Sequence, residues 1–167
     1  MDKISQIIGQ VTMALTRGLL GPGETAELRR IDPERPSCPA FWRVMTVWIA
    51  PEKRLSPEQE NRWAMILSGM ARMKPLLSLP GRTLGKALAE AGFTERRLAR
   101  LLRTTDAKNL ADQVRRITGF LVSQGVPINW IDFAYFILTT DPEKREEKNR
   151  SVAADYYYAI KQKETVT

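Results

Sequence analysis

The chain has 167 residues, of which 43% are hydrophobic and 27% charged, and its formal net charge is +7. These values predict a globular protein with one domain or two small subdomains, and no apolar run approaches the roughly 20 residues of a transmembrane helix. The first twenty residues lack the basic start and unbroken apolar core of a signal peptide. We therefore expect a cytoplasmic protein with no membrane partner.

The cysteine and histidine counts restrict the chemistry of the chain. It has one cysteine, Cys38, and no histidine. A single cysteine cannot form an internal disulfide, and no Cys/His zinc site or Ser-His or Cys-His catalytic pair can form without histidine. We expect no catalytic residue, no metal ligand and no cofactor, and we interpret Cys38 as an inert thiol.

Four helices are predicted in the first half of the chain, over residues 2–19, 24–30, 39–49 and 57–73. Apolar residues with a period of 3.6 indicate the first helix, and Gly21-Pro22-Gly23 breaks it. Pro39 suits the first turn of the third helix, while Ser56 followed by Pro57 predicts the N-cap of the fourth.

Five more helices are predicted in the second half, over residues 83–92, 94–103, 110–124, 129–138 and from 141 onward. Pro75 and Pro80-Gly81 frame a connector between the two halves. The predicted fold class is therefore an all-α bundle of about eight or nine helices. We interpret it either as two packed sub-bundles, residues 1–78 and 79–163, or as one compact domain.

The positive charge is concentrated in the middle of the chain, in the sixth and seventh predicted helices. Arg96, Arg100 and Arg103 follow i, i+4, i+7 spacing and would share one helix face, with leucines turned to the core. Arg115 and Arg116 extend that face if the two helices pack side by side. Such a row predicts contacts with nucleic-acid phosphates. The alternative is a solvated face with salt bridges to the charged last helix.

Two further interpretations of these segments concern other functions. The helices on either side of Gly92 resemble a helix-turn-helix, so a DNA-binding transcription regulator is an alternative. The second of these helices offers few side chains that recognise base edges, however. Glu146 and Lys148 have the E-x-K spacing of some metal-dependent nucleases, but their segment is typical of a charged helix rather than a strand. A purely structural adaptor is the third alternative.

A set of short motifs, in this order and spacing, carries a family resemblance. The motifs are AELRR at 26–30, CPAFWR at 38–43, LGKALA at 84–89, TERR at 94–97, LLR at 101–103, VRR at 114–116 and PINW at 127–130. Together they cover about residues 24–150. On these motifs the chain resembles the CasB-type small subunit of the type I-E CRISPR surveillance complex, Cascade.

The resemblance implies a non-catalytic all-α subunit of a crRNA-guided complex of antiviral defence. Two copies would contact CasC-type backbone subunits and the large subunit. Their basic surface would hold crRNA and target DNA and guide the displaced strand, because guide pairing supplies sequence while protein recognises shape and phosphates. The nucleic-acid contacts that the resemblance implies map onto Arg30, Arg103, Lys108 and Arg116, and onto Lys144 or Arg145.

Overall fold

The structure, a computed structural model, describes residues 2–74 and 81–166, and helices joined by turns and loops make up its regular secondary structure there. These residues form nine α-helices and one short π-helical segment, and no sheet is present among them. The predicted all-α class and helix number are confirmed. The predicted connector at residues 75–80 lies outside the described residues, so the division into two sub-bundles stays a prediction.

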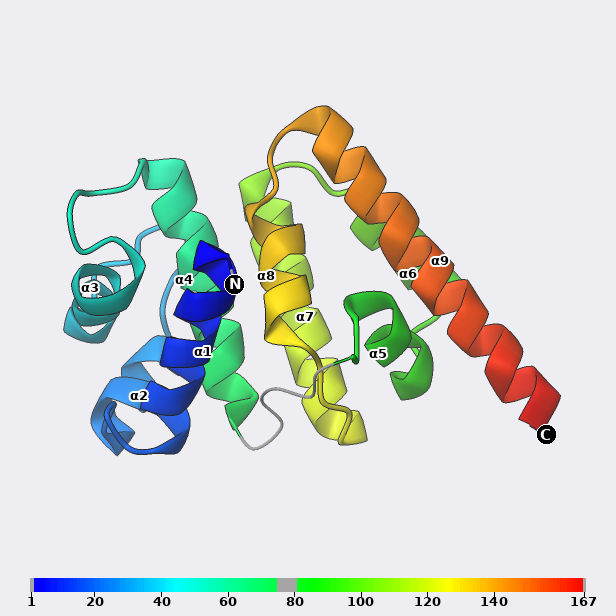
Figure 1. The fold of residues 1–167 in the computed structure, drawn as a ribbon, viewed down its shortest axis with the longest axis horizontal. Coiled ribbons are helices and arrows are strands. Elements are labelled where there is room, and N and C mark those ends of the chain that lie inside the picture. The colour runs from blue at the N-terminus through cyan, green and yellow to red at the C-terminus, as the bar shows by residue number, and fades with distance from the viewer. Residues whose placement is uncertain (1, 75–80, 167) are drawn as a thin grey trace.

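Four helices of the first half occupy one side of the molecule (Figure 1). They are α1 (Lys3–Thr16), α2 (Pro22–Arg29), α3 (Pro39–Val44) and α4 (Pro57–Arg72). The end of α1 differs from the prediction, because Gly18 adopts a φ of +78° and turns the chain. Leu19 is consequently 57% exposed, and Leu20 enters the core in its place.

The predicted helix over 39–49 changes its hydrogen-bonding pattern midway. After α3, residues Met45–Ile49 form the π-helical segment η1. The Ala50 N–H donates to the Met45 carbonyl at 2.7 Å, a bond across five residues instead of four. The prolines at both predicted N-termini are confirmed, since Pro39 begins α3 and Pro57 begins α4.

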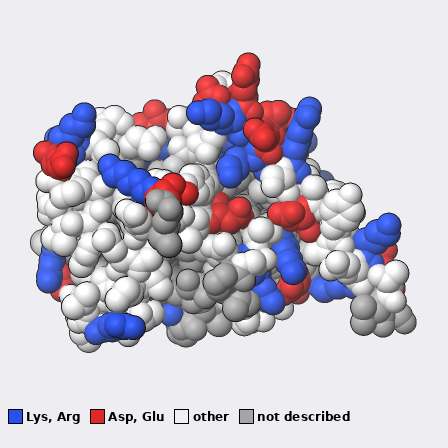
Figure 2. Space-filling model, viewed as in Figure 1, with Lys and Arg blue, Asp and Glu red and all other residues white. Residues whose placement is uncertain are grey.

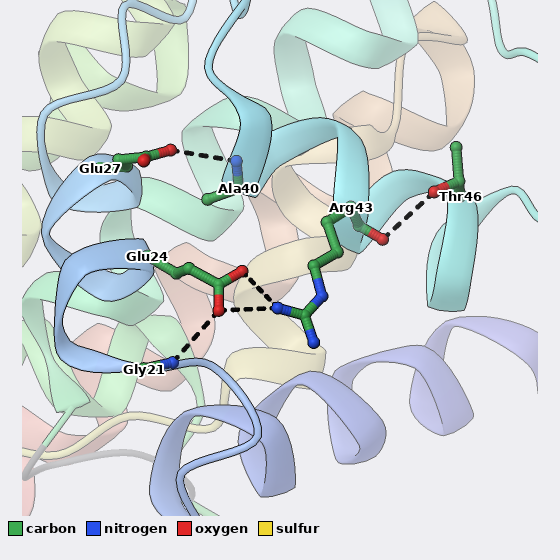
Figure 3. Close-up of polar contacts among 6 residues, drawn as sticks. All are labelled: Gly21, Glu24, Glu27, Ala40, Arg43 and Thr46. Carbon is green, nitrogen blue, oxygen red and sulfur yellow. Dashed lines mark hydrogen bonds and ion pairs between the residues drawn. The ribbon is translucent and has the colours of Figure 1, made fainter.

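Two glutamates of α2 hold the start of α3 in place (Figure 3). Glu24 accepts from the Arg43 guanidinium through both carboxylate oxygens, at 2.7 and 2.8 Å. Glu27 accepts from the Ala40 N–H at 3.0 Å, a free donor in the first turn of α3. Two of the motifs that carry the resemblance, at 26–30 and 38–43, therefore contact each other directly.

The second half comprises α5 (Leu84–Ala91), α6 (Glu95–Arg103), α7 (Ala107–Gln124), α8 (Trp130–Leu138) and α9 (Pro142–Val166). Helix α7 begins three residues earlier than predicted because the Asp106 carboxylate accepts from the Asn109 N–H at 3.0 Å and caps the helix. Helices α7 and α8 lie at the centre, with α1–α4 on one side and α5, α6 and α9 on the other (Figure 1).

A continuous hydrophobic core connects these helices. Helix α4 packs against both α7 and α8. Gly69 of α4 allows this contact, since a Cβ there would lie 2.5 Å from the ring of Trp130, which is 1% exposed. The same Cβ would lie 3.1 Å from the Thr118 side chain of α7, so the absence of a side chain at Gly69 lets α4 lie close to both helices.

Helix α5 packs tightly on α9 and places the turn into α6. A Cβ on Gly85 would lie 2.2 Å from the backbone oxygen of Val152, so only glycine allows the two backbones to approach so closely. At the end of α5, Gly92 has a φ of +86°, and the Tyr156 hydroxyl donates to the carbonyl of the next residue, Phe93. Helix α9 therefore fixes the point at which α6 begins.

Candidate nucleic-acid interface

Helix α6 separates its leucines from its arginines, as the sequence predicts. Leu98 and Leu101 are 2% and 0% exposed and anchor the helix in the core. The Thr94 hydroxyl accepts from the Arg97 N–H at 3.3 Å and caps the first turn. The exposed face of α6 therefore carries its arginines at fixed positions beside α7.

Helices α6 and α7 enclose a hollow of about 400 Å³ that collects three of the predicted contacts. Arg100 and Arg103 reach it from α6, and Arg116 reaches it from α7. The two helices both line this hollow, but they are not among the closely packed helix pairs of the fold, and of the predicted pair Arg115 and Arg116 only Arg116 reaches it. Asp106 and Asp112 also line this hollow.

A second hollow, of about 440 Å³, continues the first along the same two helices. It shares Arg100, Gln113 and Arg116 with the first and adds Arg97 and two aromatic rings. We call the two hollows together the α6–α7 groove. Its four arginines, against two aspartates, are Arg97, Arg100, Arg103 and Arg116.

The arginines of the α6–α7 groove have no carboxylate partner among the residues that the structure describes. Within residues 2–74 and 81–166, ion pairs join other side chains, such as Glu146 with Arg150 on α9 at 3.5 Å. The alternative of salt bridges between this row and the last helix therefore does not occur in the described chain. Unpaired guanidiniums so close together favour an anionic ligand, because their mutual repulsion is relieved by an anion between them.

The row of arginines on α6 differs in one residue from the predicted one. Arg96 does not line the groove, whereas Arg97 does. The Arg97 guanidinium lies 5.8 Å from the centroid of the Phe120 ring of α7. The i, i+4, i+7 spacing predicts which arginines share a face of α6, but not which face of α6 lies beside α7. The position of α7 therefore decides which arginines line the groove.

Other predicted contacts lie on the opposite flank of α7, in a pocket of about 290 Å³ between α4 and α7. We call it the α4–α7 pocket, and its basic lining residues are Arg30, Arg72, Lys108 and Arg115. Three acidic residues also line it: Asp32, Glu34 and Asp112. The cations there are nearly balanced, so the α6–α7 groove carries the stronger net positive charge.

Arg72 is a member of the α4–α7 pocket that the sequence did not indicate. Its guanidinium donates to the Arg29 carbonyl at 3.1 Å. Burial, and secondarily the charge of Arg115, lower the pKa of Arg72 from its ordinary value. An isolated basic residue in the last turn of a helix is a common feature, and only the packing of α4 against α7 brings it to this pocket.

Lys144 and Arg145 lie apart from both sites. Lys144 is exposed in the first turn of α9, near Tyr135 and Glu147. Arg145 is 8% exposed, and its guanidinium donates to the Phe136 carbonyl at 2.8 Å. Its position under the end of α8 removes it from the surface that we assign to nucleic acid.

The surface near Lys144 carries mixed charge. Figure 2 shows basic and acidic side chains side by side at the top of the molecule, where α9 begins in Figure 1. Asp141 caps that helix by accepting from the Lys144 N–H at 3.0 Å, and Glu146 pairs with Arg150 on the same helix. The E-x-K spacing therefore lies on a charged helix, as we interpreted it.

The described residues contain neither a cluster of metal ligands nor a membrane-spanning helix. No group of three or more Cys, Asp or Glu side chains in that part of the chain could hold a metal ion. No helix formed by those residues is both long enough and apolar enough to cross a membrane.

The chain belongs to the family of the CRISPR-associated protein Cse2, whose family model matches residues 24–157. This range includes α6, α7 and both basic sites. The comparison with curated proteins finds no match.

Solved structures share the fold. CasB from M. ruber superposes with a TM-score of 0.72 at 18% identity, covering 94% of this chain and 98% of its own. CasB from Thermus thermophilus gives 0.67 at 19% identity, covering 91% of this chain and 98% of its own. A chain of E. coli Cascade bound to a PAM-containing dsDNA target superposes with a TM-score of 0.66 at 21% identity, covering 90% of this chain and 96% of its own. The predicted CasB-type resemblance is confirmed.

Proposed function

We propose that this protein is the small subunit of a Cascade complex and that its α6–α7 groove holds a nucleic-acid backbone. The observation that carries the proposal is the groove itself. Its four arginines form no ion pair with any described carboxylate, and the leucines of α6 anchor that helix in the core. Membership of the Cse2 family supports the setting, and so does the shared fold with a chain of DNA-bound E. coli Cascade.

The mode of binding that the groove favours is independent of sequence. Arginines contact phosphate oxygens, which are the same at every base step. The displacement of counterions by such contacts makes affinity fall steeply as salt increases. The α4–α7 pocket, with Arg30, Lys108 and Arg115, is a second and weaker contact in this proposal, because its acidic residues offset most of its charge.

The partners in this proposal are crRNA, target DNA, the CasC-type backbone, the large subunit and a second copy of the chain. The protein contributes no catalytic residue and acts by electrostatic retention of the strands. A helix-turn-helix regulator is the competing function. Against it, Arg100 and Arg103 of α6 line a groove shared with α7, an arrangement suited to gripping a backbone rather than to entering a DNA groove.

A charge-reversal variant tests the proposal. Arg103→Glu combined with Arg116→Glu should weaken retention of target DNA by the assembled complex at least tenfold, because each guanidinium contact to a phosphate is lost and repulsion replaces it. The single variant Arg103→Glu is compared with Arg96→Glu as its matched control, since the two make the same charge change on α6, one inside the groove and the other outside it. Gel-shift titration of the reconstituted complex measures the effect.

The same titration separates the two functions. A regulator would bind one duplex site roughly 10³-fold more tightly than random DNA, whereas a Cascade subunit shows no such preference of its own. Unchanged DNA retention in the double variant would show that the surface assigned here is wrong.

A further inference from the structure

We propose that the aromatic end of the α6–α7 groove binds an unpaired nucleobase, so that the groove takes single-stranded nucleic acid with one base turned into the protein. This inference rests on the proposed function and specifies the form of its ligand. It starts from a feature that phosphate contacts leave unexplained, namely two phenylalanine rings beside a row of arginines.

The two rings form the floor of this part of the groove. Phe93 is 5% exposed, while Phe120 is half-buried, so that part of its ring faces the hollow. Their centroids are 5.8 Å apart with the planes tilted by 55°. Phe93 thereby supports Phe120 from the core side. A supported ring at the surface of a basic groove is the arrangement on which single-stranded nucleic acid stacks its bases, because every base has a π-face.

The polar groups around the rings complement a base as well. The planar guanidinium of Arg97, 5.8 Å from the Phe120 centroid, has no carboxylate partner in the described chain. Such a cation stacks readily on a flat π-system. Gln113 lines the same hollow, and its amide forms no hydrogen bond with another described residue. A free amide both donates and accepts, as a base edge requires.

Phosphate and base sites adjoin each other. Arg100, Gln113 and Arg116 line both hollows of the groove, so a phosphate held there places its nucleoside at the aromatic end. The aromatic hollow measures about 440 Å³, within the range of about 300–1,000 Å³ of small-ligand sites. A duplex keeps its bases paired and stacked inside, so it cannot present one to this hollow without unpairing. The ligand is therefore an unpaired strand.

A side chain of a protein partner is the other conceivable occupant of an apolar hollow. The charge of the groove favours the nucleotide, because four arginines against two aspartates attract a polyanion. An apolar side chain would bury these guanidiniums without neutralising them, which is costly.

The test uses the full chain and two fluorescent 12-nucleotide DNA strands of equal charge, one intact and one built of abasic sites. By fluorescence anisotropy, the unmodified protein should bind the intact strand about tenfold more tightly, the effect of one stacked base. Phe120→Leu retains the apolar volume and removes the aromatic face. It should lower affinity for the intact strand about tenfold, to the abasic level, and leave the abasic strand unaffected.

Two variants control for unrelated effects. Phe120→Tyr retains a ring and should restore binding of the intact strand. Tyr158→Leu removes an aromatic residue that is 69% exposed on α9, outside the groove, and should change neither affinity. Equal binding of the two strands, or equal losses on both in Phe120→Leu, would overturn the base site and leave the phosphate groove intact. Failure of the unmodified protein to bind either strand would overturn the proposed function together with the base site.

Discussion

Arginines occupy two contrasting environments in this protein. In the α6–α7 groove, Arg100, Arg103 and Arg116 meet around a hollow and lack counter-ions in the described chain. Under the end of α8, Arg62 and Arg145 are 3% and 8% exposed and donate to main-chain carbonyls. The first group is available to a ligand, whereas the second group already has its partners within the fold.

The buried pair serves the C-terminus of α8. Arg62 donates to the Ile137 carbonyl at 2.6 Å, and Arg145 donates to the Phe136 carbonyl at 2.8 Å while lying 3.8 Å from the centroid of the Phe136 ring. The last carbonyls of a helix have no partner inside it, and cations there also favour the helix dipole. Burial, and then the charge of Arg62, lower the pKa of Arg145 to about 10, so its charge persists at neutral pH.

The comparison teaches that the partner of a basic residue, more than its charge, decides its role. Desolvated guanidiniums are stable only where hydrogen-bond acceptors replace water. The carbonyls of α8 fulfil this condition for Nη1 of Arg62 and of Arg145, while Nε of Arg62 and Nη2 of Arg145 are buried without a hydrogen-bond partner among the described residues. In the α6–α7 groove, the hydrogen-bond acceptors for the guanidiniums must come from water or from an anionic ligand.

The largest expected effect on stability comes from Arg145→Met. It removes the donor to the Phe136 carbonyl and should lower the free energy of unfolding by about 2 kcal/mol, because a buried acceptor is left unpaired. Urea unfolding followed by circular dichroism measures it. Lys144→Met, at an exposed neighbour, should change stability by less than about 0.5 kcal/mol. A variant of normal stability that loses nucleic-acid binding would instead place Arg145 at the interface.

A smaller effect, on binding instead of folding, is expected for Arg100→Gln. The loss of one phosphate contact should weaken binding several-fold and reduce the slope of log K against log salt by about 1. The free energy of unfolding should change by no more than about 0.5 kcal/mol, since Arg100 is exposed. Anisotropy titrations between 50 and 200 mM salt measure the slope, about the range over which such contacts lose their strength. An unchanged slope would contradict phosphate contact.

The smallest effect is expected for Arg43→Ala, which represents an intermediate case: exposed, yet paired. The Arg43 side chain is 53% exposed and contacts Glu24 at 2.7 Å (Figure 3). Exposed ion pairs contribute about 0–1 kcal/mol, so the loss in unfolding free energy should stay below about 1 kcal/mol. A loss above about 2 kcal/mol in urea unfolding would show that this junction of α2 and α3 supports much more of the fold.

Much of the fold was predictable because its signals are local. Periodic apolar residues, prolines at Pro39 and Pro57 and the caps at Ser56 and Thr94 all act within one or two turns. The errors also have local causes. The end of α1 depends on the left-handed turn at Gly18. The start of α7 depends on the cap at Asp106, so the helix begins three residues before the predicted start at Leu110.

Sequence by itself determined the helical class, the family and the wealth of arginine around α6 and α7. Tertiary structure alone decided which arginines share a surface. It placed Arg97 in the groove and left Arg96 out, brought Arg72 beside Arg115, and enclosed Arg145 beneath α8. The physical reason is that a charge takes its role from partners that lie far away in the chain, and helix packing alone brings those partners together.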